Sequence, residues 1–323
     1  MPSDATLLLV DKLAVDAVLV ADDVLLAVLE AFVLHSQREG RVFPVIREPL
    51  ATGGIFGIKA GDVQSQSLLG FKAAGFWPSN RRQGGEPHQA TILLFDPATG
   101  RPYCVIDGNA ITTVRTGAAG ALGLQTLARA DSQRLVIFGT GVQARSQLGF
   151  ALRVLPGLKQ VRYVPSDRQP HADFEALFSS QCDIQHAHDA NDAVLEADIV
   201  ITATPGGGAL FDANAVRPGT HLNCVGADTK GKRELPEGLL AKARVVVDDL
   251  HQAAQLGELQ WSPSTPAQEL GDYLSGTVAA DRNPSEITIF DMTGLALQDL
   301  TVARLIFQKA STVGVGTRVA WPW

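Results

Sequence analysis

The sequence predicts an α/β protein in which a doubly wound parallel sheet is joined to an α+β domain, and three observations support this. Six short apolar runs follow one another from Arg134 onward with helix-like segments between them, which is the pattern of parallel strands buried on both faces. Residues 41–107 instead contain short β-like runs separated by Gly, Pro and Asn, as in an antiparallel sheet. A glycine-rich turn at 139–144 connects the first parallel run to a helix-like segment.

The first helix is expected to begin at Asp22, which can cap it, and to end at Gly40. Its apolar residues recur with the spacing of one helix face at Leu25, Val28, Leu29, Phe32 and Val33. The antiparallel strands expected next are 42–46, 55–58, 70–73 and 91–95. The parallel strands are expected at 134–138, 161–164, 199–202, 221–225, 245–247 and 287–290. A last helix is expected from Gln298 to about Gln308, packed back on the first domain.

Composition limits the partners. The chain has 323 residues, of which 27 are Lys or Arg and 34 are Asp or Glu, so its net charge is -7. A chain with this negative net charge has no positive electrostatic field to attract a nucleic acid or an anionic membrane, and we expect neither partner. Cys104, Cys182 and Cys224 are widely separated in apolar surroundings, which predicts buried, reduced thiols of a cytoplasmic protein. Acidic residues interrupt the N-terminal apolar runs, so neither a signal peptide nor a membrane span is expected.

The glycine-rich turn is typical of a Rossmann-type nucleotide site. Gly139 permits the tight turn, Gly141 lets the backbone approach a pyrophosphate, and Ala144 permits close packing of helix and strand. The following helix supplies N–H donors at its start. The expected cofactor contacts in this turn are Gly139, Thr140, Gly141, Val142, Gln143 and Ala144.

The second parallel strand leaves the choice between NAD and NADP open. NAD specificity normally places an acid at the end of this strand, where the chain has Pro165. Asp167 could reach a ribose, while Ser166 or Arg168 could receive a 2′-phosphate. All three are candidate cofactor contacts.

Six ordered motifs resemble the ornithine cyclodeaminase and mu-crystallin family almost from end to end. They lie at Leu69–Asn80, Phe95–Gly100, Ile111–Ala118, Gly139–Ala144, Val225–Leu235 and Ile287–Ala296. The resemblance implies a homodimer with a substrate-binding and dimerisation domain at residues 1–118 and an NAD(P)-binding Rossmann domain at 119–296. Residues 297–323 would then form a C-terminal helix that returns to the first domain.

The same resemblance assigns roles to individual residues. Arg47, Lys72 and Arg115 match positions that hold a substrate α-carboxylate, and Asp228 matches the acid/base residue, with Lys232 in support. Asp228 and Lys72 are the expected catalytic residues. Thr293 replaces a serine that family members often place close to the nicotinamide, and its hydroxyl is expected to be available. Further expected cofactor contacts are Arg115, Thr116, Thr204, Lys232 and Thr293.

Within the family, the chain resembles the iminosuccinate reductase branch at Phe56–Gly61, Phe76–Asn80, His88–Gln89 and Asp228–Lys232. Lys59 adds a cation on a strand next to that of Lys72, which suits a dicarboxylate, and His88 is a second candidate for the far carboxylate. The implied reaction is NAD(P)H-dependent reduction of iminosuccinate, an α-imino acid, to L-aspartate.

Three alternatives stay open at this point. They are an ornithine cyclodeaminase, a cyclic ketimine or alanine-type dehydrogenase, and a non-enzymatic small-ligand binding protein like mu-crystallin. His186 and His188 have no third ligand at a fixed spacing, so no metal is expected.

Overall fold

The computed structural model describes residues 5–321, and their contacts divide the chain into two compact units. The first unit contains the described residues up to Arg115 together with those from Leu295 onward. The second unit extends from Thr116 to Gly294. The predicted fold class is confirmed, because one unit is built on a doubly wound parallel sheet and the other on a mixed sheet with helices.

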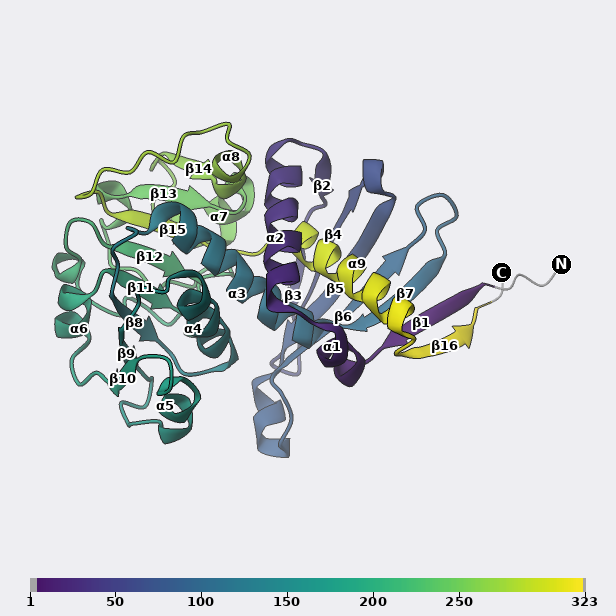
Figure 1. Ribbon diagram of the computed structural model, residues 1–323, viewed down its shortest axis with the longest axis horizontal. Coiled ribbons are helices and arrows are strands. Elements are labelled where there is room, and N and C mark those ends of the chain that lie inside the picture. Colours follow the sequence, from purple (N-terminus) through teal and green to yellow (C-terminus); the bar gives the residue numbers. More distant parts are fainter. Residues whose placement is uncertain (1–4, 322–323) are drawn as a thin grey trace. The chain divides into compact units, whose positions relative to one another are not determined.

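The first unit is built on an eight-stranded sheet with the order β16-β1-β7-β6-β5-β4-β2, in which β3 also pairs with β4. Its strands are β1 (Thr6–Val10), β2 (Gly40–Val42), β3 (Ile46–Pro49), β4 (Ile55–Val63), β5 (Leu68–Phe76), β6 (His88–Phe95), β7 (Pro102–Asp107) and β16 (Thr317–Ala320). Its helices are α1 (Lys12–Val18), α2 (Ala21–Ser36), α9 (Ala296–Val313) and the start of α3 (Gly108–Leu127). Helices α2 and α9 lie against each other, and α9 crosses β4, β5 and β6 (Figure 1).

Several details of the first unit differ from the sequence prediction. Strands β1, β7 and β16 were not predicted, and the first helix ends at Ser36, whereas Gly40 begins β2. Asp22 is not the cap of α2, because Val20 occupies the cap position in an extended conformation and Asp22 lies in the first turn, where its charge favours the helix dipole. The predicted strand 42–46 is split between β2 and β3. Pro44 lies in the break and has no N–H to donate to a ladder.

The strand register assigns side chains of the first sheet to two faces. Lys59, Lys72, Ile92, Ile106 and Val10 form one row of directly opposed residues on the face that α9 covers. Ile92, Ile106 and Val10 are almost fully buried. The two lysines therefore lie at the end of an apolar row, which is an unusual position for charged groups.

The other face of this sheet carries a second row, Ala60, Phe71, Leu93, Val105 and Leu9. All five are apolar and are exposed or half-exposed. The rings of Phe71 and Phe95 stack on this face with centroids 5.7 Å apart.

The second unit is built on an eight-stranded sheet with the order β10-β9-β8-β11-β12-β15-β13-β14, and every pair in it is parallel. Its strands are β8 (Arg134–Phe138), β9 (Gln160–Val164), β10 (Asp183–His186), β11 (Ile199–Thr202), β12 (His221–Cys224), β13 (Arg244–Val247), β14 (Ala267–Glu269) and β15 (Thr288–Asp291). Its helices are the rest of α3, α4 (Val142–Val154), α5 (Ala172–Phe178), α6 (Ala190–Glu196), α7 (Leu250–Leu256) and α8 (Leu270–Leu274). The six predicted parallel strands are all present.

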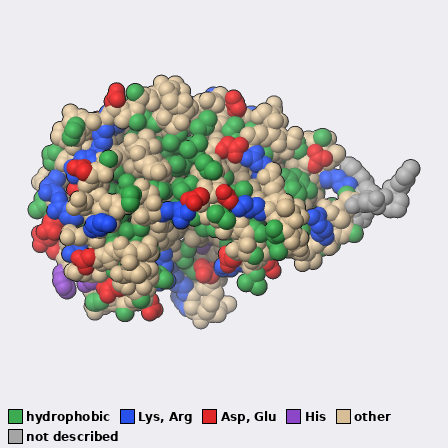
Figure 2. Space-filling view, viewed as in Figure 1, with side chains coloured by type: hydrophobic (Ala, Val, Ile, Leu, Met, Phe, Trp, Pro, Cys, Tyr) green, Lys and Arg blue, Asp and Glu red, His purple; other side chains and the backbone are tan. Residues whose placement is uncertain are grey.

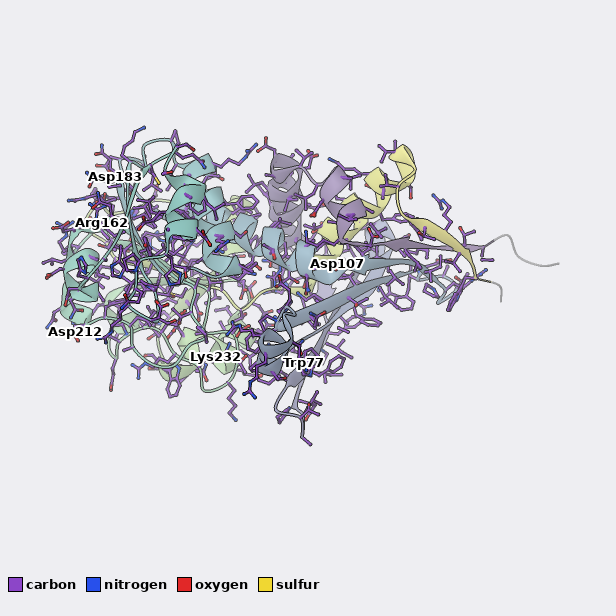
Figure 3. The ribbon with its side chains drawn as sticks, turned by 90° about the horizontal axis from the view of Figure 1, so that it is seen from below. Trp77, Asp107, Arg162, Asp183, Asp212 and Lys232 are labelled. Atoms are coloured by element: carbon purple, nitrogen blue, oxygen red, sulfur yellow. The ribbon has the colours of Figure 1, made fainter. Side chains whose placement is uncertain are left out.

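Two strands of the second unit, β10 and β14, were not predicted. Both are short edge strands that contain polar residues. At the β10 edge of the sheet, Arg162 on β9 and Asp183 on β10 form a 3.5 Å ion pair between neighbouring strands (Figure 3).

The strand order of the second unit reverses beside β8, whose neighbours are β9 and β11. Because all eight strands are parallel, the loops that follow β8, β11, β12 and β15 leave the sheet at the same edge. Ligands of doubly wound sheets bind at the carboxyl ends of the strands, at such a switch point.

Charges of both signs are interspersed on the face shown in Figure 2, without a large field of one sign. Among residues 5–321, no helix is both long enough and apolar enough to cross a membrane. The three cysteines are free thiols. Cys104 and Cys224 are buried, whereas Cys182 is half-buried, contrary to the expectation for all three.

Candidate functional site

A buried cluster of charges forms the centre of the candidate substrate site in the first unit. Lys72 on β5 forms a 2.7 Å ion pair with Asp299 in the first turn of α9, and Arg115 on α3 reaches the other carboxylate oxygen of Asp299 at 3.1 Å. The three residues are between 1% and 7% exposed. Arg115 also donates to Gln298 Oε1 at 3.0 Å, and Lys72 donates to Thr112 Oγ1 at 3.2 Å.

Burial and neighbouring charges set the protonation of this cluster. Burial, the largest effect, lowers the pKa of Lys72 to about 7, against the opposing influence of Asp299. Arg115 and Lys59 lower the pKa of Lys72 further. Burial would raise the pKa of Asp299, but Lys72 and Arg115 outweigh it and hold that pKa below its usual range. Asp299 is therefore ionised at neutral pH.

Two further predicted cations lie on the same face of the sheet. Lys59 is directly opposite Lys72, and Arg47 is opposite Gly57, two residues from Lys59 on β4. Both Lys59 and Arg47 are half-buried. The four predicted cations thus share one sheet face or its flanking helix, and Lys72 and Arg115 share Asp299 as their acid.

His88 lies on the same face at the start of β6, next to α3. The amide nitrogen of Asn109 donates to the His88 carbonyl at 3.1 Å, so the amide oxygen faces His88 Nδ1 at 2.9 Å. Nδ1 must therefore carry a proton, and Nε2 of the neutral ring is an acceptor. Burial, followed by Lys72 and Arg115, lowers the pKa of His88. A neutral His88 cannot donate to a carboxylate from Nε2, which weakens its expected role at the far carboxylate.

The glycine-rich turn of the second unit has the features that a pyrophosphate needs. Gly139 has a φ of 100°, and a Cβ there would lie 2.6 Å from the Ala203 carbonyl oxygen. A Cβ on Gly141 would have no atom within 4 Å, so space lies beside the turn. Gly141 is also the N-cap of α4, and no side chain caps this helix start. Its N–H groups therefore suit a phosphate, and the turn fits a dinucleotide.

The loop after β9 is tied to this turn by a histidine. His171 Nδ1 lies 3.0 Å from Thr140 Oγ1, and His171 Nε2 lies 3.0 Å from Asp167. Ser166 and Arg168 are exposed beside Asp167. The loop thus presents a carboxylate that suits a ribose and groups that suit a 2′-phosphate, so the choice between NAD and NADP stays open.

The loop after β12 presents Asp228 at the carboxyl edge of the second sheet. Lys232 Nζ donates to Asp228 Oδ1 at 2.7 Å, and Thr229 donates to the same oxygen at 3.1 Å. The Asp228 side chain is 37% exposed and that of Lys232 is 32% exposed; Figure 3 labels Lys232. Asp228 is thus accessible to a ligand while a cation stabilises its charge.

Glu234 connects this loop to the loop after β11. Its two carboxylate oxygens accept from the Gly226 N–H at 2.8 Å, the Thr202 hydroxyl at 2.7 Å, and the Thr204 N–H and hydroxyl at 2.8 and 2.6 Å. Glu234 is fully buried. It therefore positions Thr204, a predicted cofactor contact, relative to the start of the Asp228 loop.

Two other predicted cofactor contacts are held inside the second unit. The Thr293 hydroxyl donates to Asp248 Oδ1 and accepts from Gln252 Nε2, each at 2.6 Å. These contacts use the single O–H donor and one of the two lone pairs of this hydroxyl, which can still accept one further hydrogen bond. Thr116 is buried, and its carbonyl accepts from Gln147 on α4 at 2.7 Å.

Comparison with known proteins shows the family to which the chain belongs. The profile of the ornithine cyclodeaminase/mu-crystallin family matches residues 8–314. The chain belongs to this family. The resemblance inferred from the six motifs is thereby confirmed.

Members of the ornithine cyclodeaminase/mu-crystallin family similar to this chain include named reductases and dehydrogenases. An iminosuccinate reductase from Paracoccus denitrificans is 33% identical over 304 residues, which cover 91% of this chain and 93% of that protein. The solved structure of a Paracoccus denitrificans iminosuccinate reductase in complex with NAD+ has a TM-score of 0.88 at 31% identity, covering 97% and 99% of the two chains. An archaeal alanine dehydrogenase dimer with bound NAD has a TM-score of 0.91 at 30% identity, with the same coverage.

Three residues of the candidate site in this chain were not predicted from the sequence. Asp299 lies in the predicted last helix, but no local pattern indicates that it faces Lys72. Glu234 belongs to the motif at 225–235, where it directly follows Lys232 and Arg233 and precedes the apolar Leu235. His171 lies within four residues of Asp167, a spacing that permits their contact.

Proposed function

We propose that this protein is an NAD(P)H-dependent imine reductase that forms L-aspartate from iminosuccinate. As a member of its family, the chain is an NAD(P)-dependent oxidoreductase that acts on carbon–nitrogen bonds. The observation that carries the finer proposal is the direct opposition of Lys59 and Lys72 in the register of β4 and β5. Four cations on this side of the unit, two of which share Asp299, match the two carboxylates of a dicarboxylate better than the single carboxylate of alanine or proline.

In this proposal Arg47, Lys72 and Arg115 bind the α-carboxylate and Lys59 binds the far carboxylate. Bound there, the substrate has its charges neutralised away from water, where ion pairs are stronger. A cyclodeaminase would instead need an acidic or polar partner for a distant amine, whereas Lys59 offers a cation at the side of the site that a longer substrate reaches.

In this proposal the turn at 139–144 and the N-terminus of α4 would hold the phosphates of the cofactor, with Thr140, Gln143 and Thr204 as further contacts. When bound, NAD(P)H supplies the hydride that adds to the imine carbon. Asp228 stabilises the protonated imine nitrogen by its charge, or takes up a proton from solvent and passes it to this nitrogen. Lys232 orients Asp228 through their 2.7 Å contact.

The same proposal includes a homodimer in the cytoplasm. The half-exposed apolar row on the uncovered face of the first sheet, from Ala60 through Phe71 to Leu9, is the kind of surface that protein partners cover. The alanine dehydrogenase with a similar fold is described as a dimer.

An NAD(P)H oxidation assay tests this function. The substrates are oxaloacetate with ammonia, pyruvate with an amine, and a cyclic imino acid, each with NADH and with NADPH. We expect the highest kcat/KM with oxaloacetate and ammonia, and L-aspartate as the product by chiral chromatography. Oxaloacetate without ammonia is the control, because it separates imine reduction from ketone reduction. Efficient turnover of the cyclic imino acid alone would overturn the proposal.

A further inference from the structure

Asp299 lies where it can control both central cations of the substrate site. It is in the first turn of α9, whereas Lys72 is on β5 and Arg115 on α3, so one carboxylate joins three elements of the first unit. Each oxygen of Asp299 contacts a different cation. Its side chain is 1% exposed, so it does not present an open face to solvent.

Some N–H groups of Lys72 and Arg115 are not used in these contacts, and they can bind a substrate carboxylate. A lysine ammonium has three N–H groups, of which one faces Asp299 and another faces Thr112. The guanidinium of Arg115 uses Nε for Asp299 and Nη1 for Gln298. A substrate carboxylate can therefore accept from the third Lys72 N–H and from the remaining Arg115 N–H groups.

We propose that Asp299 is a positioning residue of this site, whose buried carboxylate fixes Lys72 and Arg115 in one geometry and supplies a negative charge between them away from water. This inference rests on the proposed function in one respect, that the ligand carries a carboxylate. Asp299 itself acts through the two cations and does not contact the reacting atoms.

The charge balance around Lys72 gives the proposal a measurable consequence. The titratable groups facing Lys72 are Lys59 on β4, His88 on β6, Arg115 on α3 and Asp299 on α9. Of these, Asp299 is the group that raises the pKa of Lys72, which burial holds at about 7. Removal of the Asp299 charge would therefore leave Lys72 neutral at pH 7. Above its pKa, Lys72 must take up a proton when a carboxylate binds.

Calorimetric titration with succinate, an unreactive dicarboxylate, measures both effects without turnover. Titration in buffers of different ionisation enthalpy gives the number of protons taken up at each pH. For the wild-type protein we expect uptake to begin near pH 7. For Asp299→Asn we expect this onset to move down by a pH unit or more and the affinity at pH 7 to fall at least about tenfold, since each unit of pKa is a factor of ten.

Two further variants separate charge from structure. Asp299→Glu keeps the charge, so the pH of proton uptake should stay near the wild-type value even where the affinity falls. Asp62→Asn removes another buried carboxylate of the same unit, which pairs with Arg41 at 2.7 Å on the opposite sheet face, and should leave the onset unchanged. If Asp299→Asn does not fold, a shifted onset in Asp299→Glu would overturn the proposal.

The positioning role of Asp299 would also be overturned if Asp299→Asn bound succinate with wild-type affinity and took up protons from the same pH as the wild type. An equal shift of this pH in Asp62→Asn would overturn it too. A wild-type protein that binds succinate but reduces no imine contradicts the proposed function and leaves the role of Asp299 intact. A wild-type protein that binds neither succinate nor oxaloacetate contradicts both.

Discussion

Lys59 and Lys72 lie directly opposite each other on the antiparallel strands β4 and β5, on the buried side of the sheet. Like charges in this relationship are unfavourable, because directly opposed side chains are about 5 Å apart at Cβ. Their effect on each other is seen at Lys72, whose pKa is lowered by burial first and also by Lys59. A bound dicarboxylate would relieve the repulsion, which makes the pair a determinant of substrate charge.

Substitution of Lys59 tests that determinant. We expect Lys59→Ala to raise the KM for iminosuccinate by roughly 10–100-fold, the worth of one charge-assisted hydrogen bond, with little change for a monocarboxylate imine. Steady-state kinetics with oxaloacetate plus ammonia and pyruvate plus an amine give the comparison. An equal loss with both substrates would contradict the role of Lys59.

Asp228→Asn tests proton transfer and charge at the imine nitrogen. We expect kcat to fall by about 10²–10⁴-fold, the usual contribution of a general acid or base, while NAD(P)H binding stays near wild type. Fluorescence titration of NAD(P)H measures the second quantity. Thr229→Val is the matched control, because it removes a hydrogen bond to Asp228 Oδ1 but keeps the carboxylate. Reductase activity near wild type in Asp228→Asn would refute the assignment.

The two glycines of the nucleotide turn should respond differently to alanine. Gly139→Ala should lower the free energy of unfolding by about 1–3 kcal/mol, because Gly139 has a φ of 100° and a Cβ would meet the Ala203 carbonyl. Gly141→Ala should leave stability unchanged, since its φ is -75° and its Cβ has open space. It should nevertheless weaken NAD(P)H binding by more than about tenfold, or ~1.4 kcal/mol, because that space is where a pyrophosphate would approach. Thermal unfolding and fluorescence titration measure both, and unchanged binding in Gly141→Ala would contradict the site.

Glu258 should make stability depend on pH. Burial raises its pKa to about 7, against the effect of the Glu234 and Leu235 N–H groups that donate to it. A carboxyl group with a raised pKa stabilises the fold fully below its unfolded pKa, and this stability is lost as pH rises to about 7. Glu258→Gln should therefore reduce the loss of stability between pH 4.5 and 7, by up to about 3 kcal/mol. Denaturant unfolding of the wild-type protein and of Glu258→Gln at pH 5 and pH 7.5 measures this difference. If stability depends on pH equally in both proteins, the role of Glu258 is refuted.

The parallel sheet was predictable because buried parallel strands such as Ile199–Thr202 are continuous apolar runs that repeat between helices. The strands of the first unit were harder to predict from the sequence. Strand β1 pairs with β7 and β16, which are far away in the sequence, and its acidic neighbours hide it. The cations of the site could be found because charged residues at the edges of apolar runs stand out. Asp299 could not, because its contact with Lys72 joins two distant segments that no local pattern relates.

Arg115 and Asp299 are 184 positions apart, so the ribosome makes the cations of the site long before it makes their acidic partner. When Lys59, Lys72 and Arg115 have left the ribosome, their counter-ion has not been made, and the whole second unit is translated before α9 follows. Domains generally fold as units while the chain emerges. The second unit can therefore complete its sheet first, whereas the part of the first sheet that α9 covers, on β4, β5 and β6, stays uncovered until the last segment is made.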